Sequence, residues 1–206
     1  MSAIHEKWRA DRGDEILVLD YPLNENSQVV ELGGFQGLWT KRVSTKFNCN
    51  ILVVEPIKEF YDKMLHEFEY YLKNNLHKIK TENAGISTEE KELFFAVDGD
   101  ATSAYLNSNN PVKITCHTLE HYLSKHNIDK IDLMQVNIEG EEYPLMLEWI
   151  NSQIIKKVRY IQVQYHRMGE QYEQKHKTIQ EGLINLGFEK RWEYPFVWES
   201  WENKQF

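Results

Sequence analysis

Two glutamates and a glycine-rich turn are the residues of this sequence whose types and spacing best suit ligand chemistry. An apolar run that contains Glu31 leads directly into three glycines, Gly33, Gly34 and Gly37. Glu55 ends the next apolar run. Because the carboxyl ends of parallel strands meet at one edge of an α/β sheet, both carboxylates are expected at one ligand site. The glycines would allow a tight turn, a close approach of backbone to ligand, and close packing of the following helix.

The spacing of these residues narrows the choice of ligand. The glycines miss the Gly-x-Gly-x-x-Gly pattern of dinucleotide sites by one position, and no Lys-Ser/Thr pair follows Gly37 as it would in a P-loop. Glu31 would repel a pyrophosphate and attract a cation, whereas Glu55 can accept hydrogen bonds from both hydroxyls of a ribose. S-Adenosylmethionine, a cationic nucleoside without phosphate, fits these residues best. A nicotinamide dinucleotide and a purely structural turn remain the alternatives.

A second group of polar residues follows two later apolar runs and could carry the chemistry of methyl transfer. Such a transfer needs alignment of the reacting atoms, and an alcohol acceptor must also lose a proton. His166 is the first candidate base, because the unperturbed pKa of histidine lies near physiological pH. Glu139 is the second, or it orients His166; Asn137 can position a ligand but cannot act as a base. The alternatives are a structural histidine and a carboxylate placed at a helix N-terminus.

Three further histidines do not form a recognised metal motif. His117 and His121 are four positions apart on a predicted helix, with His126 nearby. In the zinc-protease pattern a glutamate directly follows the first histidine, whereas here Glu120 precedes the second. A solvated helix face is therefore expected, and no metal ion is predicted.

The elements that must position these residues alternate between strands and helices. Continuous apolar runs predict buried strands over 29–32, 51–54, 131–136 and 158–163. Shorter strands are expected over 16–19, 77–82, 92–97 and 112–116. Helices are predicted over 36–47, 57–72, 118–126, 141–150 and 172–186, with a polar loop over 98–110. This order predicts a mostly parallel α/β sheet with helices on both faces, in a single domain with an N-terminal extension and first strand over 1–27 and a core over 28–201.

The C-terminal part of the core is unusually rich in aromatic residues. Alternating rings around Pro195 predict an antiparallel hairpin over 188–201. One face of such a hairpin should pack on the core, and the other could contact a sugar or a second subunit. A homo-oligomer formed through this hairpin is therefore a possible assembly. The rings concerned are those of Trp192, Tyr194, Phe196, Trp198 and Trp201.

Composition limits the partners of this protein. The 206 residues include 24 Lys and Arg against 32 Asp and Glu, a net charge of −8, which argues against binding to nucleic-acid backbones. The apolar runs are far shorter than the ~20 residues that a bilayer requires, so no membrane span is expected. Two cysteines, Cys49 and Cys116, make no disulfide framework and no zinc site with four cysteines. A globular, cytoplasmic protein is the expectation.

Four segments of the sequence resemble the FkbM family of S-adenosylmethionine-dependent methyltransferases. They span residues 29–37, 53–56, 131–142 and 161–166, in the family's order. The third is the most specific, although Gln135 and Asn137 stand where the family usually has Lys and Asp. Gln164, two residues before His166, stands where Glu is common. These differences resemble a subgroup of the family.

The resemblance implies a class I, Rossmann-like methyltransferase fold and O-methylation of a hydroxyl on a sugar, glycan or similar small molecule. It also implies that Asn83 and Ala84, after the third strand, lie on the adenine side of the cofactor. Two other functions remain open: a non-catalytic, methyltransferase-like binding module and, less favoured, a nicotinamide-dependent oxidoreductase.

Overall fold

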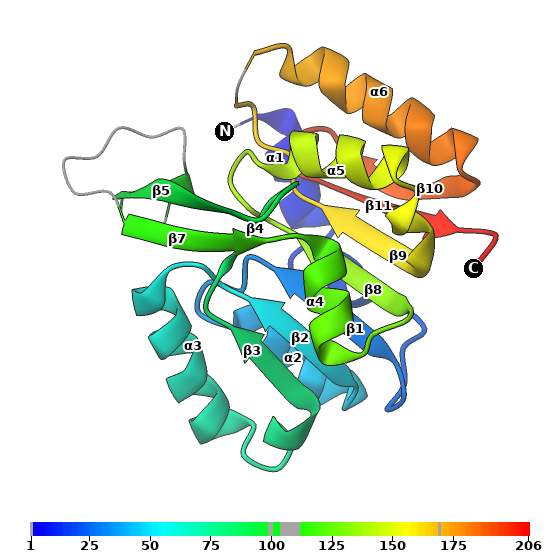
Figure 1. Ribbon diagram of the computed structural model, residues 1–206. Helices are drawn as coiled ribbons and strands as arrows, with labels where there is room; N and C mark the ends of the chain where they lie inside the picture. The colour runs from blue at the N-terminus through cyan, green and yellow to red at the C-terminus, as the bar shows by residue number, and fades with distance from the viewer. Residues whose placement is uncertain (1, 99–100, 104–111, 169) are drawn as a thin grey trace.

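The computed structural model describes residues 2–98, 101–103, 112–168 and 170–206. The main sheet is formed by β1 (Gln28–Leu32), β2 (Asn50–Val54), β3 (Ile79–Glu82), β8 (Ile131–Val136), β9 (Val158–Val163), β10 (Phe188–Tyr194) and β11 (Trp198–Asn203). Their order across the sheet is β10-β11-β9-β8-β1-β2-β3 (Figure 1). The five strands from β9 to β3 pair in parallel. The predicted mostly parallel sheet is therefore confirmed.

Helices cover both faces of this sheet because its strands are apolar on both sides. In β1, Val30 and Leu32 belong to one buried cluster and Val29 to the other. Residues of α4, α5 and α6 pack in the first cluster, and residues of α1, α2 and α3 in the second. The helices are α1 (Ala3–Ala10), α2 (Leu38–Phe47), α3 (Lys58–Tyr71), α4 (Leu119–His126), α5 (Glu142–Asn151) and α6 (Tyr172–Asn185).

The C-terminal hairpin completes the sheet in an order that differs from the chain order. Strand β11 lies between β9 and β10 and is antiparallel to both. Trp201 of β11 is completely buried and belongs to the first cluster. The predicted antiparallel hairpin is confirmed, and it forms one edge of the main sheet.

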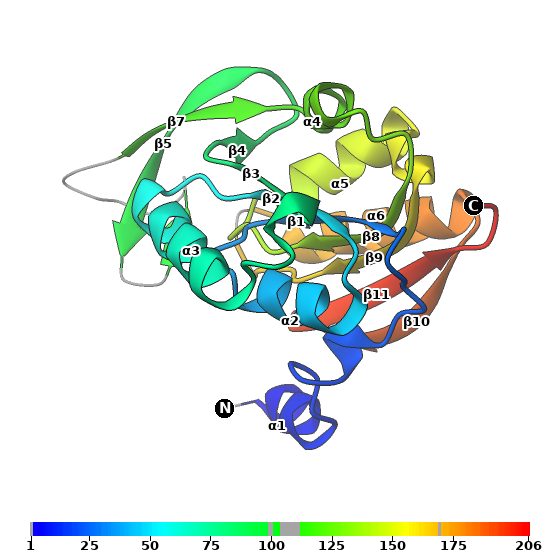
Figure 2. The ribbon, with the colours of Figure 1, turned by 90° about the horizontal axis from the view of Figure 1, so that it is seen from below.

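A second, smaller sheet projects from the body beyond the carboxyl ends of the main strands. It consists of β4 (Gly85–Ile86), β7 (Val112–His117), β5 (Lys91–Asp98) and β6 (Ala101–Ser103), in that order. Figures 1 and 2 show β5 and β7 side by side in this projection. The predicted polar loop falls partly in β5 and β6, and its residues 99–100 and 104–110 lie outside the described residues.

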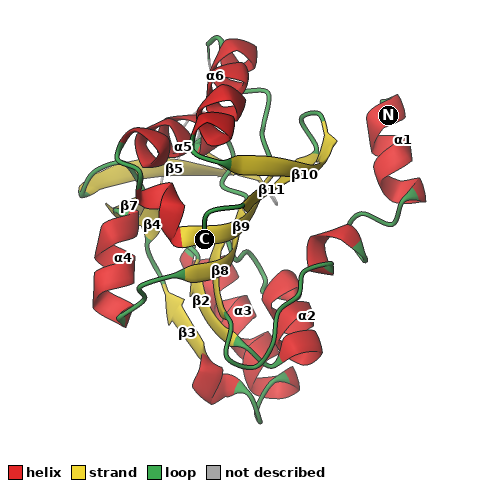
Figure 3. Cartoon of the chain, turned by 90° about the vertical axis from the view of Figure 1, so that its right-hand side faces the viewer, coloured by secondary structure: helices red, strands yellow, loops and turns green. Residues whose placement is uncertain are grey.

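The N-terminal segment differs from the prediction. The expected strand over 16–19 is wrong, because Leu17–Leu19 form the 3-10 helix η1. Before it comes α1, which Figure 3 shows set apart from the other helices. It packs against the hairpin, with the ring of Trp8 centred 5.0 Å from that of Tyr194 and 5.8 Å from that of Trp192.

In the aromatic tail, the side chains of Tyr194, Trp198 and Trp201 are buried, whereas those of Trp192 and Phe196 are partly exposed. Among the described residues, no helix is long and apolar enough to cross a membrane.

Candidate active site

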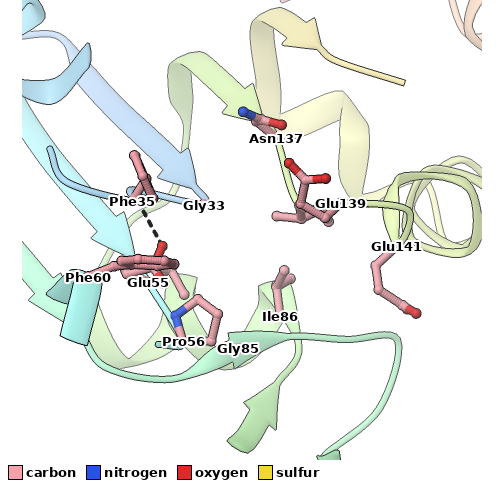
Figure 4. A pocket seen from close by; sticks show the side chains of 12 residues that line it. Gly33, Phe35, Glu55, Pro56, Phe60, Gly85, Ile86, Asn137, Glu139 and Glu141 are labelled. Carbon is pink, nitrogen blue, oxygen red and sulfur yellow. Dashed lines mark hydrogen bonds between the residues drawn. The ribbon is translucent and has the colours of Figure 1, made fainter. Parts of the chain in front are cut away.

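A pocket opens where the carboxyl ends of β1, β2 and β8 meet the short strand β4 (Figure 4). This is the edge at which ligands bind in open α/β sheets. Acidic side chains and apolar side chains share its wall. The lining residues are Gly33, Phe35, Val54, Glu55, Pro56, Phe60, Gly85, Ile86, Asn137, Ile138, Glu139 and Glu141.

The predicted glycine turn forms one side of this pocket, and its glycines have different structural roles. Gly33 has φ +89°, and a Cβ there would lie 1.9 Å from the backbone oxygen of Asn137, so only glycine lets the two strand ends approach this closely. Gly37 has φ +79°, and a Cβ there would lie 2.6 Å from Cε1 of Phe68, so it lets α2 pack on α3. Gly34 packs against Val53 in the same way. Of the three, Gly33 lines the pocket.

Glu55 lies at the end of β2 with its carboxylate in the pocket wall. Oε2 accepts the backbone N–H of Phe35 at 2.8 Å, and Oε1 accepts that of Ile57 at 2.8 Å (Figure 4 shows the first bond). Burial raises the pKa of Glu55 to about 7, against these two hydrogen bonds, which lower it. A carboxylate has about four acceptor positions, so both oxygens can still accept hydrogen bonds from a ligand diol.

Glu31 does not line the pocket, although it lies only two residues before Gly33. Its carboxylate faces α2, where Thr40 Oγ1 donates to Oε2 and Gln135 Nε2 donates to Oε1 at 3.2 Å. Burial raises its pKa to about 8, against the hydrogen bonds from Thr40 and Gln135, which lower it. Glu31 therefore links β1 to α2 and β8 on the side of the glycine turn that faces away from the pocket.

The segment after β3 contributes to the pocket through residues next to the predicted pair. Asn83 donates from Nδ2 to the backbone oxygens of Glu55 at 3.0 Å and Pro56 at 3.1 Å. Ala84 is buried in the core. The next residues along the chain, Gly85 and Ile86, are the ones that line the pocket. Asn83 thus holds the backbone that presents Glu55.

A histidine between two carboxylates lies beside the pocket. Nδ1 of His166 is 2.9 Å from Oε1 of Glu142, and Nε2 is 3.4 Å from Oε2 of Glu139. Glu142 is completely buried, and its two oxygens also accept the backbone N–H groups of Ile138 at 3.1 Å and Gly140 at 2.8 Å. The structure therefore brings the predicted His166 and Glu139 together, and it adds Glu142 as the residue that fixes them.

The charge state of His166 differs from the expected one. Burial alone would lower the pKa of an imidazole, but the hydrogen bonds and negative charges of Glu139 and Glu142 raise the pKa of His166 to about 10. The imidazole is therefore protonated at neutral pH. An imidazolium cannot accept a proton, so His166 could act as the predicted base only after losing this proton. Glu139 has φ +56°, a backbone conformation that non-glycine residues adopt at some cost, and it directs this carboxylate to the pocket wall.

Asn137 provides a test of whether the pocket suits a polar ligand. Its Oδ1 is buried and has no hydrogen-bond partner in the structure, although the residue lines the pocket. A buried acceptor without a partner is costly unless a ligand supplies a donor. The opposite wall offers the apolar surfaces of Phe60 and Ile86 for a flat heterocycle. Together with the carboxylate of Glu55, these residues fit an amino-acid-bearing nucleoside.

A family model agrees with this geometry. The model of the methyltransferase FkbM domain matches residues 31–190. The chain belongs to the FkbM methyltransferase family. S-Adenosylmethionine is therefore its cofactor, and methyl transfer is its reaction. Among curated proteins, none matches the sequence.

Solved structures show the same fold as this FkbM-family chain. A putative rRNA methylase from Clostridium thermocellum has a TM-score of 0.58 at 10% identity, covering 94% of each chain. An rRNA methylase from Streptococcus thermophilus has a TM-score of 0.53 at 12% identity, covering 88% of this chain and 89% of that one. Fibrillarin from Aeropyrum pernix has a TM-score of 0.50 at 12% identity, covering 95% and 73%. The predicted class I methyltransferase fold is confirmed.

Several residues in and beside the pocket were not singled out by sequence reasoning. Glu142 lies in an acidic run at the start of a helix, where a carboxylate that caps the N-terminus is common. The sequence did contain a signal for this role, because a glutamate in the first turn of a helix can accept hydrogen bonds from the backbone N–H groups just before it. The apolar lining residues Phe60 and Ile86 carry no comparable signal, since apolar residues at such spacing usually belong to the core.

Proposed function

We propose that this FkbM-family methyltransferase transfers the methyl group to a hydroxyl of a sugar, glycan or similar uncharged small molecule. The observation that carries this proposal is the acidic pocket wall. Glu55, Glu139 and Glu141 line it, and none of the described residues lining it is a lysine or arginine. A polyol can donate hydrogen bonds to carboxylates, whereas a phosphate group would be repelled by them.

RNA is the competing acceptor, since two of the proteins with the same fold are described as rRNA methylases. An RNA acceptor needs lysine or arginine contacts to its phosphates. The sequence of residues 99–111 contains neither residue type. The net charge of −8 also disfavours binding to the phosphates of RNA. We therefore favour the uncharged acceptor.

In the proposed reaction, Glu139 acts as the base and His166 as its charged support. The cofactor, when bound, supplies an electrophilic methyl group on a sulfonium. Glu55 and Asn137 would hold this cofactor, and the carboxylate of Glu139 would take the proton of the acceptor hydroxyl. The imidazolium of His166, 3.4 Å from that carboxylate, holds it in place, and Asn137, two residues before Glu139 in the segment after β8, positions the ligand. Glu31 would not contact the ligand; its hydrogen bonds with Thr40 and Gln135 would stabilise the glycine turn.

Two measurements test the proposal in sequence. Calorimetric titration with S-adenosylhomocysteine should give binding that Glu55→Ala loses, whereas Glu25→Ala, an exposed glutamate away from the pocket, should bind normally. Release of S-adenosylhomocysteine is then measured with a panel of sugars and glycosides and, separately, with structured RNA.

The outcomes separate the candidate functions. Turnover with a sugar that falls by roughly 10²- to 10⁴-fold in Glu139→Gln supports the proposed base. Turnover with RNA but with no sugar would contradict the proposed acceptor. Binding of S-adenosylhomocysteine without turnover on any acceptor would favour the non-catalytic binding module.

A further inference from the structure

A cluster of two histidines and a glutamate lies on the second sheet, outside the methyl-transfer pocket. The side chains of Glu90, His117 and His121 each offer a ligand atom, and these atoms lie within 4.8 Å of one another. The sequence suggested that both histidines share a helix face. In the structure, however, His117 ends β7 and only His121 lies in α4.

The two imidazoles are held parallel and point the same nitrogen at one carboxylate. Their ring centroids are 4.0 Å apart, with 13° between the planes. Nδ1 of His117 is hydrogen-bonded to Oε2 of Glu90, and Nδ1 of His121 is 3.5 Å from Oε1 of the same carboxylate. The ligand atoms already lie close together, and a cation shared by them would require one imidazole to turn out of this stacked arrangement so that both nitrogen lone pairs converge on the ion.

Neighbouring residues fix the orientation of these candidate ligands. Oε1 of Glu90 accepts the backbone N–H of Thr118 at 3.1 Å, and Oγ1 of Thr118 accepts the backbone N–H of His121 at 3.2 Å. Both imidazoles meet the ring of the buried Tyr122 nearly at right angles, with centroids 5.7 Å and 5.6 Å away. Metal sites characteristically have such second contacts, which limit the rotamers of their ligands. All three side chains remain partly exposed, so an ion can reach them.

We propose that Glu90, His117 and His121 bind a divalent transition-metal ion of the zinc type. Two imidazole nitrogens and one carboxylate oxygen are the ligand set of tetrahedral zinc sites that keep a fourth position for water. Imidazole ligands favour zinc, nickel or copper over magnesium or calcium, which prefer oxygen atoms. On binding, the ion replaces the proton between His117 and Glu90, and that proton passes to solvent.

The position of this site gives the ion a structural effect on the pocket. Glu90 comes from the turn before β5, whereas His117 ends β7 and His121 begins α4, so the ion joins three segments. Tyr122, against which both imidazoles pack, donates its hydroxyl to the backbone oxygen of the pocket-lining Gly85 at 2.6 Å. An ion at this site would therefore hold the projecting sheet against α4 and steady that wall of the pocket.

The test uses the full chain without a histidine tag, titrated with Co²⁺ as a spectroscopic substitute for Zn²⁺. We expect saturable visible absorption of four-coordinate cobalt, displacement by Zn²⁺, and a rise in Tm with Zn²⁺. Both signals should be lost in His121→Ala and Glu90→Gln. They should persist in His66→Ala, which removes an exposed histidine on α3.

Absence of saturable binding would overturn the proposal, as would equal binding in wild type and His121→Ala, which would indicate adventitious ions only. Circular dichroism shows whether each variant is folded, and Glu90→Gln decides the question if His121→Ala is not. Metal binding is measured here without any acceptor or cofactor, so its failure is distinguishable from failure of the proposed methyl transfer.

Discussion

Oε1 of Glu142 lies 2.9 Å from Nδ1 of His166, and the two residues form a partly buried ion pair between the segments that follow β8 and β9. The same carboxylate binds the backbone N–H groups of Ile138 and Gly140. One side chain therefore fixes both the turn that presents Glu139 and the histidine beside it. The catalytic group proposed here depends on a residue that need not touch the substrate.

Replacing Glu142 by Gln should separate positioning from ligand binding. The amide cannot accept all three hydrogen bonds of the carboxylate, and it no longer balances the charge of His166. We expect the free energy of unfolding to fall by about 1–3 kcal/mol and kcat to fall, with the Kd for S-adenosylhomocysteine nearly unchanged. Urea unfolding, calorimetry and turnover measure the three quantities. Glu25→Gln is the matched control, and unchanged turnover in Glu142→Gln would contradict the positioning role.

The raised pKa of His166 predicts a stabilising effect that disappears only in alkaline solution. Because the folded-state pKa is about 10 and the unfolded value is 6.5, the imidazolium stabilises the fold fully below about pH 6.5. That stabilisation is lost as the pH rises through about 10. The difference in unfolding free energy between wild type and His166→Gln should follow this course in urea titrations. A difference that has already vanished near pH 7 would mean that the two carboxylates do not control the histidine.

Binding of S-adenosylhomocysteine should weaken in mildly acidic solution. The pKa of Glu55 is raised to about 7, so the carboxylate gains a proton as the pH falls through 7 and accepts fewer hydrogen bonds from the ribose. If only the ionised form binds, the Kd should rise by up to about tenfold for each pH unit below 7. Glu55→Gln should bind weakly and independently of pH over this range. An equal pH dependence in wild type and variant would assign it to another group.

Glu31 should make the fold less stable as the pH rises. Its folded-state pKa is about 8, against 4.5 for a free glutamate side chain, so the folded chain retains a proton that the unfolded chain loses over this range. The free energy of unfolding therefore decreases between about pH 4.5 and 8. Replacement by Gln should reduce that decrease, whereas Glu25→Gln should leave it as in wild type. Chemical denaturation at a series of pH values measures the difference.

Two glycine variants should distinguish damage to the pocket from damage to the packing. Alanine at position 33 or 37 is strained by the positive φ, at a cost of about 1–3 kcal/mol each. Gly33→Ala also displaces the backbone of Asn137 at the pocket, so it should lose ligand binding. Gly37→Ala should lower Tm while the remaining folded protein still binds S-adenosylhomocysteine. Equal loss of binding in both would show that the turn responds as one unit.

The sheet was largely predictable because its central strands are continuous apolar runs. Strands β8 and β9 have the predicted bounds, and their neighbours differ from prediction by a residue or so. Residues 16–19 misled the prediction because four apolar residues are too few to show whether their period is that of a strand or a helix. Helix α1 gave little signal, since Trp8 is its one buried residue.

The sequence predicted that the candidate site lies at the ends of particular strands, but it did not predict which side chains face the pocket. Glu31 and Glu55 both follow the alternation of a strand, and the sequence cannot tell which of them faces the pocket. The direction of Glu31 is set by Gln135, about a hundred positions away, whose amide donates to it. The pKa of His166 depends similarly on Glu139 and Glu142, which reach it only after β8 and β9 pair.

The place of β11 between β9 and β10 has a consequence for how the chain acquires its fold during synthesis. Until residues 198–203 have left the ribosome, β9 has no partner on one side, and the space occupied by Trp201 is unfilled. A nascent chain that stops at β10 therefore exposes an apolar strand edge, the kind of surface that invites chaperones or aggregation. Final closure of this edge of the sheet therefore comes late, after the strands that carry the pocket have been synthesised.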